Sequence, residues 1–273
     1  MRKQKSDFAA KFISKSGTRL FNSDDFAHAE LDKYACYVIA DGIDVHNKAE
    51  AEAAKMAVVC ILDAFEAHPS MRKSVMRDYL KQANDRLRLT NKLWSFKASV
   101  TVVVTDYVKM RYAELGNTRI KLYRDNTVEL ESSDQSLSQI QVDRWLLTRD
   151  RIAEHEERHN LASYLGQKEA LSYQPYISKK IKLKDGDIIA LYSRGVWERV
   201  DDVDLDDVFT NAGEDPQEAL DMVEELLLQG FLDTSDEVNP YTIVAIYVNK
   251  LYTDPNRKNR IMRILKIAIP VLV

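Results

Sequence analysis

Glycine is scarce in this chain. It supplies only 8 of 273 residues, about 3% against a usual 7% or so. No glycine-rich loop is present that would cradle a phosphate group with its backbone amides, so the common nucleotide-binding motifs are excluded. Few positions let the backbone approach a ligand closely, because that approach is a particular use of glycine. Compositional drift in an AT-rich genome would produce the same shortage, and that alternative stays open.

Cysteine and the usual metal-binding spacings are also nearly missing. Cys36 and Cys60 lie in apolar segments and form no C-x-x-C pair, so a zinc ribbon is excluded and reduced thiols are expected. The five histidines show no H-E-x-x-H spacing. The polar start of the chain leads into no apolar run. We therefore expect no cleaved signal peptide and a cytoplasmic location.

A strong charge of one sign is missing as well. The net charge is −4 at pH 7 and the sequence pI is about 5.8, so no nucleic acid partner is expected. Hydrophobic residues make up 45% of the chain, which is enough to build a sizeable core at this length. We expect one compact domain over residues 1–250 and a separate tail over residues 251–273.

Hydrophobic periodicity predicts two long helices set within a run of strands. Residues 47–67 and 71–93 carry apolar side chains at helical spacing, and core packing is the expected use of both stripes. Because the later strands follow one another without alternating helices, an antiparallel sheet is favoured. The segments predicted as strands are 8–13, 34–40, 98–106, 109–115, 119–124, 127–130 and 240–249. The remaining predictions are a helix near 154–165, a solvated loop or helix start at 201–207 and a helix over 216–229.

The most informative segment is L-Y-S-R-G-V-W-E at residues 191–198. It ends a buried apolar strand that the chain enters through a turn at Gly186. A strand that ends in S-D-G commonly directs a carboxylate at a cation, but here Arg194 holds the carboxylate position. The segment resembles the type 2C (PPM) metal-dependent Ser/Thr protein phosphatases, whose corresponding strand ends in S-D-G.

Six further segments resemble motifs of the same family and occur in the family's order. The motifs are R-x-x-N-[EQ]-D, V-x-D-G-x-G-G-H, A-N-x-G-D-S-R, L-T-x-D-H-S, P-x-R-N-x-L with a later L-G, and D-N-x-T-x-V. The matching segments are 17–26, 38–46, 113–119, 130–136, 156–166 and 238–244. Each match is weak alone, but together they extend the resemblance over most of the chain.

The resemblance implies an α+β fold: a four-layer α-β-β-α sandwich in which two antiparallel sheets pack face to face and helix pairs flank them. It also implies a reaction in which two divalent cations activate a water molecule that attacks a phosphate. By the same resemblance, Asp41 holds the position that bridges the cations, and Gly42 offers a carbonyl. Asp24 holds a nearby carboxylate that usually acts through bound water.

Three other positions depart from the family pattern. Arg194 and Asn239 replace two direct ligands, and Asn117 replaces an Asp that helps to bind a third cation. Mg²⁺ and Mn²⁺ need several oxygen ligands, mostly anionic, and an arginine cannot be deprotonated in a protein. We therefore expect no bound metal and predict an Arg194–Asp41 ion pair in place of the metal centre. The alternative is that Arg194 points outward as an ordinary surface arginine.

Other carboxylates would be needed to rescue an altered Mn²⁺ or Mg²⁺ site. Asp44 stands in place of a family glycine, and Asp236 and Glu237 lie just before Asn239, so a shifted loop would bring one of them inward. In that alternative, Asp41 and Gly42 are the retained metal-binding residues and the chain is an active phosphatase.

Arg19 matches the family arginine that binds the substrate phosphate, and arginine is well suited to that contact. A phosphorylated segment would then be bound without being hydrolysed. The alternative is that Arg19 pairs with Asp24, Asp25 or Asp41 and stabilises the turn.

The tail combines basic residues with a final apolar run. The apolar residues 264–273 follow four basic residues, Arg257, Lys258, Arg260 and Arg263. Basic residues before an apolar run are typical of a juxtamembrane segment at the start of a transmembrane helix. The run is shorter than the roughly 20 apolar residues that a span requires. A helix packed on the domain and an amphipathic surface anchor are the alternatives.

We therefore expect a catalytically inactive phosphatase-like domain that acts as a binding or regulatory module. The expected setting is the cytosolic face of a membrane in a bacterium that signals through Ser/Thr phosphorylation. The expected partner is a protein: a kinase, a phosphoprotein or a membrane complex. Two alternatives remain: an active Mn²⁺- or Mg²⁺-dependent phosphatase with a rearranged site, and a ligand-free scaffold domain.

Overall fold

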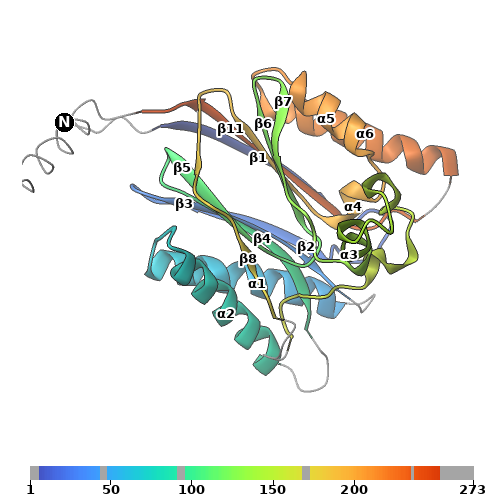
Figure 1. Cartoon of the computed structure of the whole chain (residues 1–273), viewed down its shortest axis with the longest axis horizontal. Coiled ribbons are helices and arrows are strands. Elements are labelled where there is room, and N and C mark those ends of the chain that lie inside the picture. The colour runs from blue at the N-terminus through green and yellow to red at the C-terminus, as the bar shows by residue number, and fades with distance from the viewer. Residues whose placement is uncertain (1–5, 44–47, 91–95, 168–172, 235–236, 253–273) are drawn as a thin grey trace, which may run out of the picture.

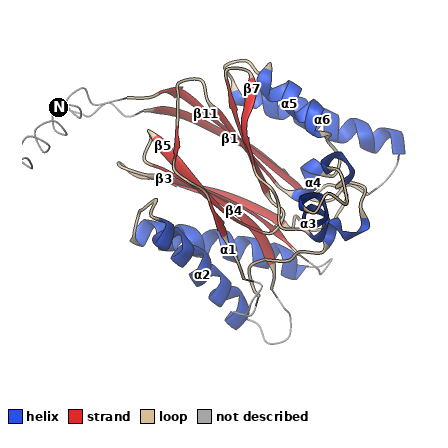
Figure 2. Ribbon diagram, viewed as in Figure 1, coloured by secondary structure: helices blue, strands red, loops and turns tan. Residues whose placement is uncertain are grey.

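The computed structural model describes residues 6–43, 48–90, 96–167, 173–234 and 237–252. Two antiparallel sheets pack face to face, and helices cover the outer face of each sheet (Figures 1 and 2). The helices α1 (Lys48–Ala67) and α2 (Lys73–Thr90) cover one sheet, while α5 (Asp202–Thr210) and α6 (Pro216–Thr234) cover the other. The predicted four-layer α-β-β-α arrangement is therefore confirmed.

The first sheet has the strand order β2-β3-β4-β5-β8. Its strands are β2 (Asp24–Glu30), β3 (Ala35–Gly42), β4 (Ala98–Thr105), β5 (Lys109–Leu115), β8 (Tyr176–Ile177) and β9 (Ile181–Lys182), which also pairs with β5. The second sheet has the order β1-β11-β10-β6-β7. Its strands are β1 (Asp7–Lys15), β6 (Arg119–Arg124), β7 (Thr127–Glu131), β10 (Ile188–Tyr192) and β11 (Tyr241–Lys250).

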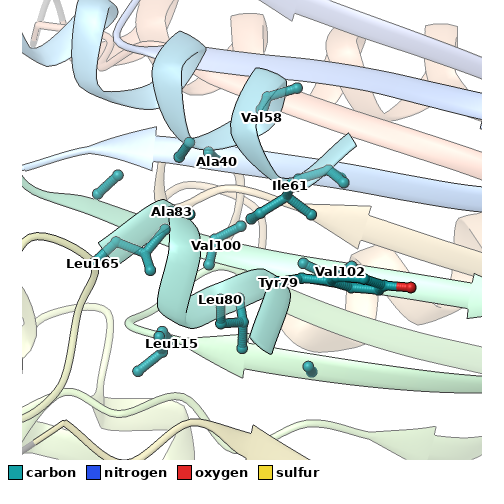
Figure 3. Close-up of a cluster of buried hydrophobic side chains, with 14 of the residues drawn as sticks. Ala40, Val58, Ile61, Tyr79, Leu80, Ala83, Val100, Val102, Leu115 and Leu165 are labelled. Carbon is teal, nitrogen blue, oxygen red and sulfur yellow. The ribbon is translucent and has the colours of Figure 1, made fainter. Parts of the chain in front are cut away.

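Three apolar clusters hold the layers together. One lies under α1 and α2, one lies between the two sheets, and one lies under α5 and α6. Figure 3 shows the first, in which Leu80 and Ala83 of α2 approach Val100 of β4 and Leu115 of β5. Strand β4 is buried along its whole length, including the polar side chains of Ser99, Thr101 and Thr105.

The strand pairing places several predicted site residues together. Asp24 opens β2 and pairs in register with Asp41 near the end of β3. Strand β10 ends at Tyr192, next to Tyr241 and Thr242 at the start of β11, and Arg119 opens β6 opposite Tyr192. Residues far apart in the sequence therefore meet at one end of the sandwich.

Two of the predicted elements are wrong or incomplete. Residues 154–165 do not form a helix: only the 3-10 turn η2 (Glu156–His159) is helical, and Asn160 after it has an extended backbone. The chain turns away because Leu161 bridges to Ser136 and Leu165 bridges to Ala98. Residues 201–207, predicted as a loop or helix start, are most of helix α5. The short helix α3 (Leu137–Asp143) and strand β2 were not predicted.

The tail prediction falls on residues 253–273, which lie outside the described part of the chain. Among the described residues, no helix is long and apolar enough to cross a membrane. Cys36 is buried, Cys60 is half-buried, and both are unpaired thiols as predicted.

Candidate functional site

The centre of the site is a pair of buried carboxyl groups. Asp24 and Asp41 are 6% and 3% exposed and lie opposite each other on β2 and β3. Burial raises the pKa of both groups, and the charge of Asp41 raises the pKa of Asp24 further. The Ser193 hydroxyl donates to Asp24 Oδ2 at 2.5 Å, whereas Asp24 Oδ1 is buried with no hydrogen-bond partner. Burial and the mutual repulsion of the two carboxylates therefore favour the protonated form of the pair.

Arg194 faces this carboxyl pair from the first position of α4 (Arg194–Trp197). Its Nε lies 3.7 Å from Asp41 Oδ2, and the charge of the guanidinium lowers the pKa of Asp41 against the effect of burial. Its Nη1 lies 2.8 Å from His159 Nδ1. The predicted Arg194–Asp41 ion pair is confirmed, and the outward-pointing alternative is wrong.

Asn239 takes part in a second set of contacts beside Arg194. Its amide nitrogen donates to Glu198 Oε2 at 3.0 Å, and its amide oxygen accepts from Arg19 Nη2 at 3.3 Å. Glu198 is largely buried, and its Oε1 accepts from Arg158 Nε at 3.1 Å and lies 3.4 Å from His159 Nδ1. Glu198 thus connects α4 with the η2 turn and with the start of β11.

Asn117 lies at the other side of the carboxyl pair and is bound to β4. The Ser99 hydroxyl donates to Asn117 Oδ1 at 2.7 Å and accepts from the Asn117 backbone N–H at 3.1 Å. Gly116 before it has a φ of +95°, and a Cβ there would collide with Ser99, so the turn requires glycine. The amide oxygen of Asn117 therefore has a structural partner.

Arg19 and Glu237 pair with each other at the rim of the site. Arg19 Nη2 lies 3.0 Å from Glu237 Oε2, and the Glu237 side chain is 71% exposed. The described contacts of Arg19 are with Asn239 and Glu237, so the predicted pairing with Asp24, Asp25 or Asp41 is not observed. The Glu237 carboxylate is directed to Arg19 rather than to Asp41 in the part of the chain that the structure describes. Asp44 and Asp236 lie outside the described residues.

A second ion pair lies beside Trp197, a member of the apolar cluster under α5 and α6. Arg119 Nε and Nη2 donate to Asp134 Oδ2 at 3.1 and 2.6 Å, and both side chains are almost fully buried. The guanidinium stacks on Trp197 at 4.0 Å, and Trp197 Nε1 donates to the Asn117 carbonyl at 2.9 Å. Glu114 nearby has its pKa raised to about 8, mainly by burial. This pair anchors α4 from below.

The described residues do not fit a centre of two divalent cations. Six positions match metal-site positions of the phosphatase motifs: Asp24, Asp41, Gly42, Asn117, Arg194 and Asn239. Of these six, only Asp24 and Asp41 are carboxylates, and the Arg194 guanidinium lies beside Asp41. Within the described ranges, no group of three or more His, Cys, Asp or Glu side chains is arranged to hold a metal ion. Gly42 continues the β3–β4 ladder opposite Ala98, and its N–H donates to the Ser23 carbonyl at 2.9 Å.

Sequence reasoning missed three residues that the structure brings into this site. They are Ser193, Glu198 and His159. Ser193 and Glu198 stand in the informative segment 191–198, so their proximity to Arg194 was available from the sequence. His159 had no such signal, because 35 residues separate it from Arg194.

Comparison with known proteins adds an independent view. No family model matches the chain. A putative protein phosphatase 2C-type from Streptococcus pyogenes serotype M6 is 24% identical over 239 residues, which cover 85% of this chain and 89% of that protein.

Solved structures share the fold. The PPM Ser-Thr phosphatase MsPP from Mycobacterium smegmatis, crystallised with cacodylate, matches with a TM-score of 0.73 and 22% identity over 88% of this chain and 98% of that one. The serine/threonine phosphatase Stp1 from Staphylococcus aureus matches with a TM-score of 0.77 and 18% identity over 91% and 98%. The chain is thus similar in sequence to a putative protein phosphatase 2C-type, and it shares the fold of solved PPM-type Ser/Thr phosphatases.

Proposed function

We propose that this chain is a phosphatase-like domain that does not carry out two-metal phosphate hydrolysis and acts instead as a binding or regulatory module. The observation that carries this proposal is the position of Arg194, whose Nε lies 3.7 Å from Asp41 Oδ2. A fixed positive charge beside the central carboxylate repels a divalent cation and pairs with the carboxylate that the cation would need.

The remaining substitutions support the same proposal. The Asn239 amide is shared between Glu198 and Arg19, and the Asn117 oxygen is bound by Ser99, so neither is directed at Asp41 by its described contacts. An amide oxygen is also a weaker ligand than a carboxylate for a hard cation. The cluster therefore supplies its own positive charge where metal-dependent phosphatases use ions.

The proposed partner is a protein that takes part in Ser/Thr phosphorylation: a kinase, a phosphoprotein or a membrane complex in the cytoplasm. Three partly exposed arginines, Arg19, Arg158 and Arg194, surround Glu198 and Asn239. Arginine side chains that are partly buried and partly exposed are common in protein interfaces.

One observation favours the alternative of an active enzyme with a rearranged Mn²⁺ or Mg²⁺ site. Asp24 Oδ1 is buried and has no hydrogen-bond partner, which is the state expected of an oxygen that awaits a ligand. A movement of Arg194 away from Asp41 would be needed before a cation could reach that oxygen.

Calorimetric titration of the full chain with Mn²⁺ and Mg²⁺, with a parallel assay of phosphate-ester hydrolysis, tests the proposal. We expect neither binding nor turnover at about millimolar metal, the weak end of protein sites for such ions. Metal-dependent turnover by the unmodified chain would overturn the proposal in favour of the rearranged enzyme.

The double variant Arg194→Asp with Asn239→Asp is the matched gain-of-function experiment. It restores two anionic oxygen ligands beside Asp41, so we expect a divalent-metal Kd in the range of about 10⁻³ M or tighter, measured by the same calorimetry. Arg151→Asp, at an exposed ion pair with Glu154, is the control and should gain no affinity. A folded double variant without metal affinity would show that the geometry of the site, and not only its charge, has changed.

A further inference from the structure

Charge is sharply divided along the C-terminal third of the sequence. Residues 200–237 contain fourteen Asp and Glu and no Lys, Arg or His. Residues 251–273 contain five Lys and Arg and one Asp. Like charges repel one another within each block, whereas the acidic block and the basic block attract each other.

The acidic block forms the outer helical layer of the second sheet. Helices α5 and α6 lie side by side on that sheet (Figure 1), with their apolar faces in the core below. Asp204, Asp207, Asp221 and Glu225 are exposed, and none makes an ion pair within the part of the chain that the structure describes. By contrast, Asp202 and Asp206 on the inner side of α5 both pair with the buried Lys121.

A groove with an apolar floor runs between these acidic side chains. It encloses about 240 Å³ and is lined by Asp204, Asp207, Glu225, Val208, Met222 and Leu226. Met222 is 50% exposed, and Val203 on the neighbouring turn is 78% exposed. Carboxylates that flank an exposed apolar strip suit a segment that is both basic and apolar.

The described chain ends beside this helical layer. Asn249 near the end of β11 lines one cavity of about 490 Å³ together with Thr210 and Glu214 at the turn between α5 and α6. Helix α6 has 19 residues and is about 28 Å long. Nine extended residues span roughly 30 Å, about the length of α6, so the residues after 252 are long enough to extend along this helix.

We propose that residues 257–269 of this chain dock in the groove between α5 and α6 of the same molecule. Arg257, Lys258, Arg260 and Arg263 supply the cations that the exposed carboxylates lack, and Ile261, Ile264 and Leu265 cover the strip that includes Met222. This selects the packed-segment alternative for the tail. The inference does not depend on the proposed function, because the groove lies on the outer face of the second sheet.

Site-specific photo-crosslinking in the full chain tests the docking. A benzophenone amino acid replaces Met222, and mass spectrometry identifies the residues that it captures. We expect capture within residues 257–269 of the same molecule, with a yield that falls about fivefold or more between about 0.05 and 0.5 M salt, because the pairs are exposed and screened. The same probe at Val59, an exposed apolar position on α1, should not capture the tail.

Charge reversal supplies the second measurement. Asp204→Lys with Glu225→Lys should reduce capture severalfold, and adding Arg257→Glu, Lys258→Glu and Arg260→Glu should restore it. Capture of another segment, capture only between two molecules, or no capture at low salt in folded protein would overturn the proposal. Loss of capture when anionic phospholipid vesicles are added would also overturn it, in favour of a membrane anchor.

Discussion

The structure contains two arginine–aspartate pairs that differ in their exposure to solvent and in the lengths of their contacts. Arg119 and Asp134 are 4% and 0% exposed and are joined by two short hydrogen bonds. Arg194 is 22% exposed and makes one longer contact of 3.7 Å with Asp41. The first pair is enclosed by Trp197 and Ser136, whereas the guanidinium of the second pair is partly exposed to solvent.

The difference separates a pair that supports the fold from a pair that lies in the candidate site. A buried ion pair is costly to break, because removal of one partner leaves an uncompensated charge in a poor solvent. A partly exposed pair contributes little to stability, so its residues are free to change. Replacing Arg194 should therefore cost less stability than replacing Arg119.

The largest effect should come from Arg119→Gln. Asp134 would remain buried with its cation removed, so we expect a loss of about 3–5 kcal/mol in the free energy of unfolding, measured by chemical denaturation. Arg119→Lys should lose less, because it keeps the charge and forfeits only the second hydrogen bond and the stacking on Trp197. Near-equal stability of Arg119→Gln and the unmodified chain would remove the contrast between the two pairs.

The next effect concerns Glu114, a second carboxyl group beside Arg119. Its pKa is about 8 in the folded chain and 4.5 as an ordinary group, so the folded state binds its proton more tightly. Stability should therefore fall as pH rises from about 4.5 to about 8, by up to roughly 1.4 kcal/mol per pH unit from this group. Glu114→Gln should reduce that slope, measured by denaturation at several pH values. An unchanged slope would mean that Glu114 is ionised when buried.

A smaller effect is expected for Arg194→Gln. The pair is partly exposed and the carboxyl groups of Asp24 and Asp41 can take up a proton, so the loss in unfolding free energy should be about 1 kcal/mol or less. The same denaturation series measures it. A loss as large as that of Arg119→Gln would show that Arg194 is a structural residue and not a replaceable one.

The smallest effect should come from Arg151→Gln. Arg151 and Glu154 form an exposed pair, 63% and 70% accessible, at 3.3 Å. We expect a change of about 0.5 kcal/mol or less, which sets the lower end of the series. A larger change would mean that exposed pairs on this segment contribute to folding.

Much of the fold could be predicted because apolar periodicity records it directly. The valine-rich strand β4 and the helical apolar stripe of α2 each appear in the sequence at their structural positions. Strand β2 was missed because Asp24–Glu30 contains a single large apolar residue, Phe26, and owes its place to pairing with β3. The helix expected near 154–165 failed because bridges to Ser136 and Ala98 pull its residues into extended backbone.

The site was predictable where a motif fixed both residue type and neighbour. Arg194 and Asp41 could be paired from the sequence because the resemblance to the PPM phosphatases implies that both occupy metal-ligand positions. The role of Glu198 could not, because its partners Arg158 and Asn239 lie about 40 residues away on either side and have no shared spacing. Such contacts are set by how the layers pack, which a one-dimensional pattern does not record.

The pairing of the first strand with the last has a consequence for how the protein is made. Among the strands that the structure describes, β1 pairs with β11 alone, and Ala10 faces Ile246 across 236 positions of chain. On the ribosome, β2 to β5 emerge within residues 24–115 and can pair early, while β1 must wait for nearly the whole chain. Until β11 has been translated, β1 remains an unpaired strand, so this first-synthesised segment is exposed to aggregation for most of translation.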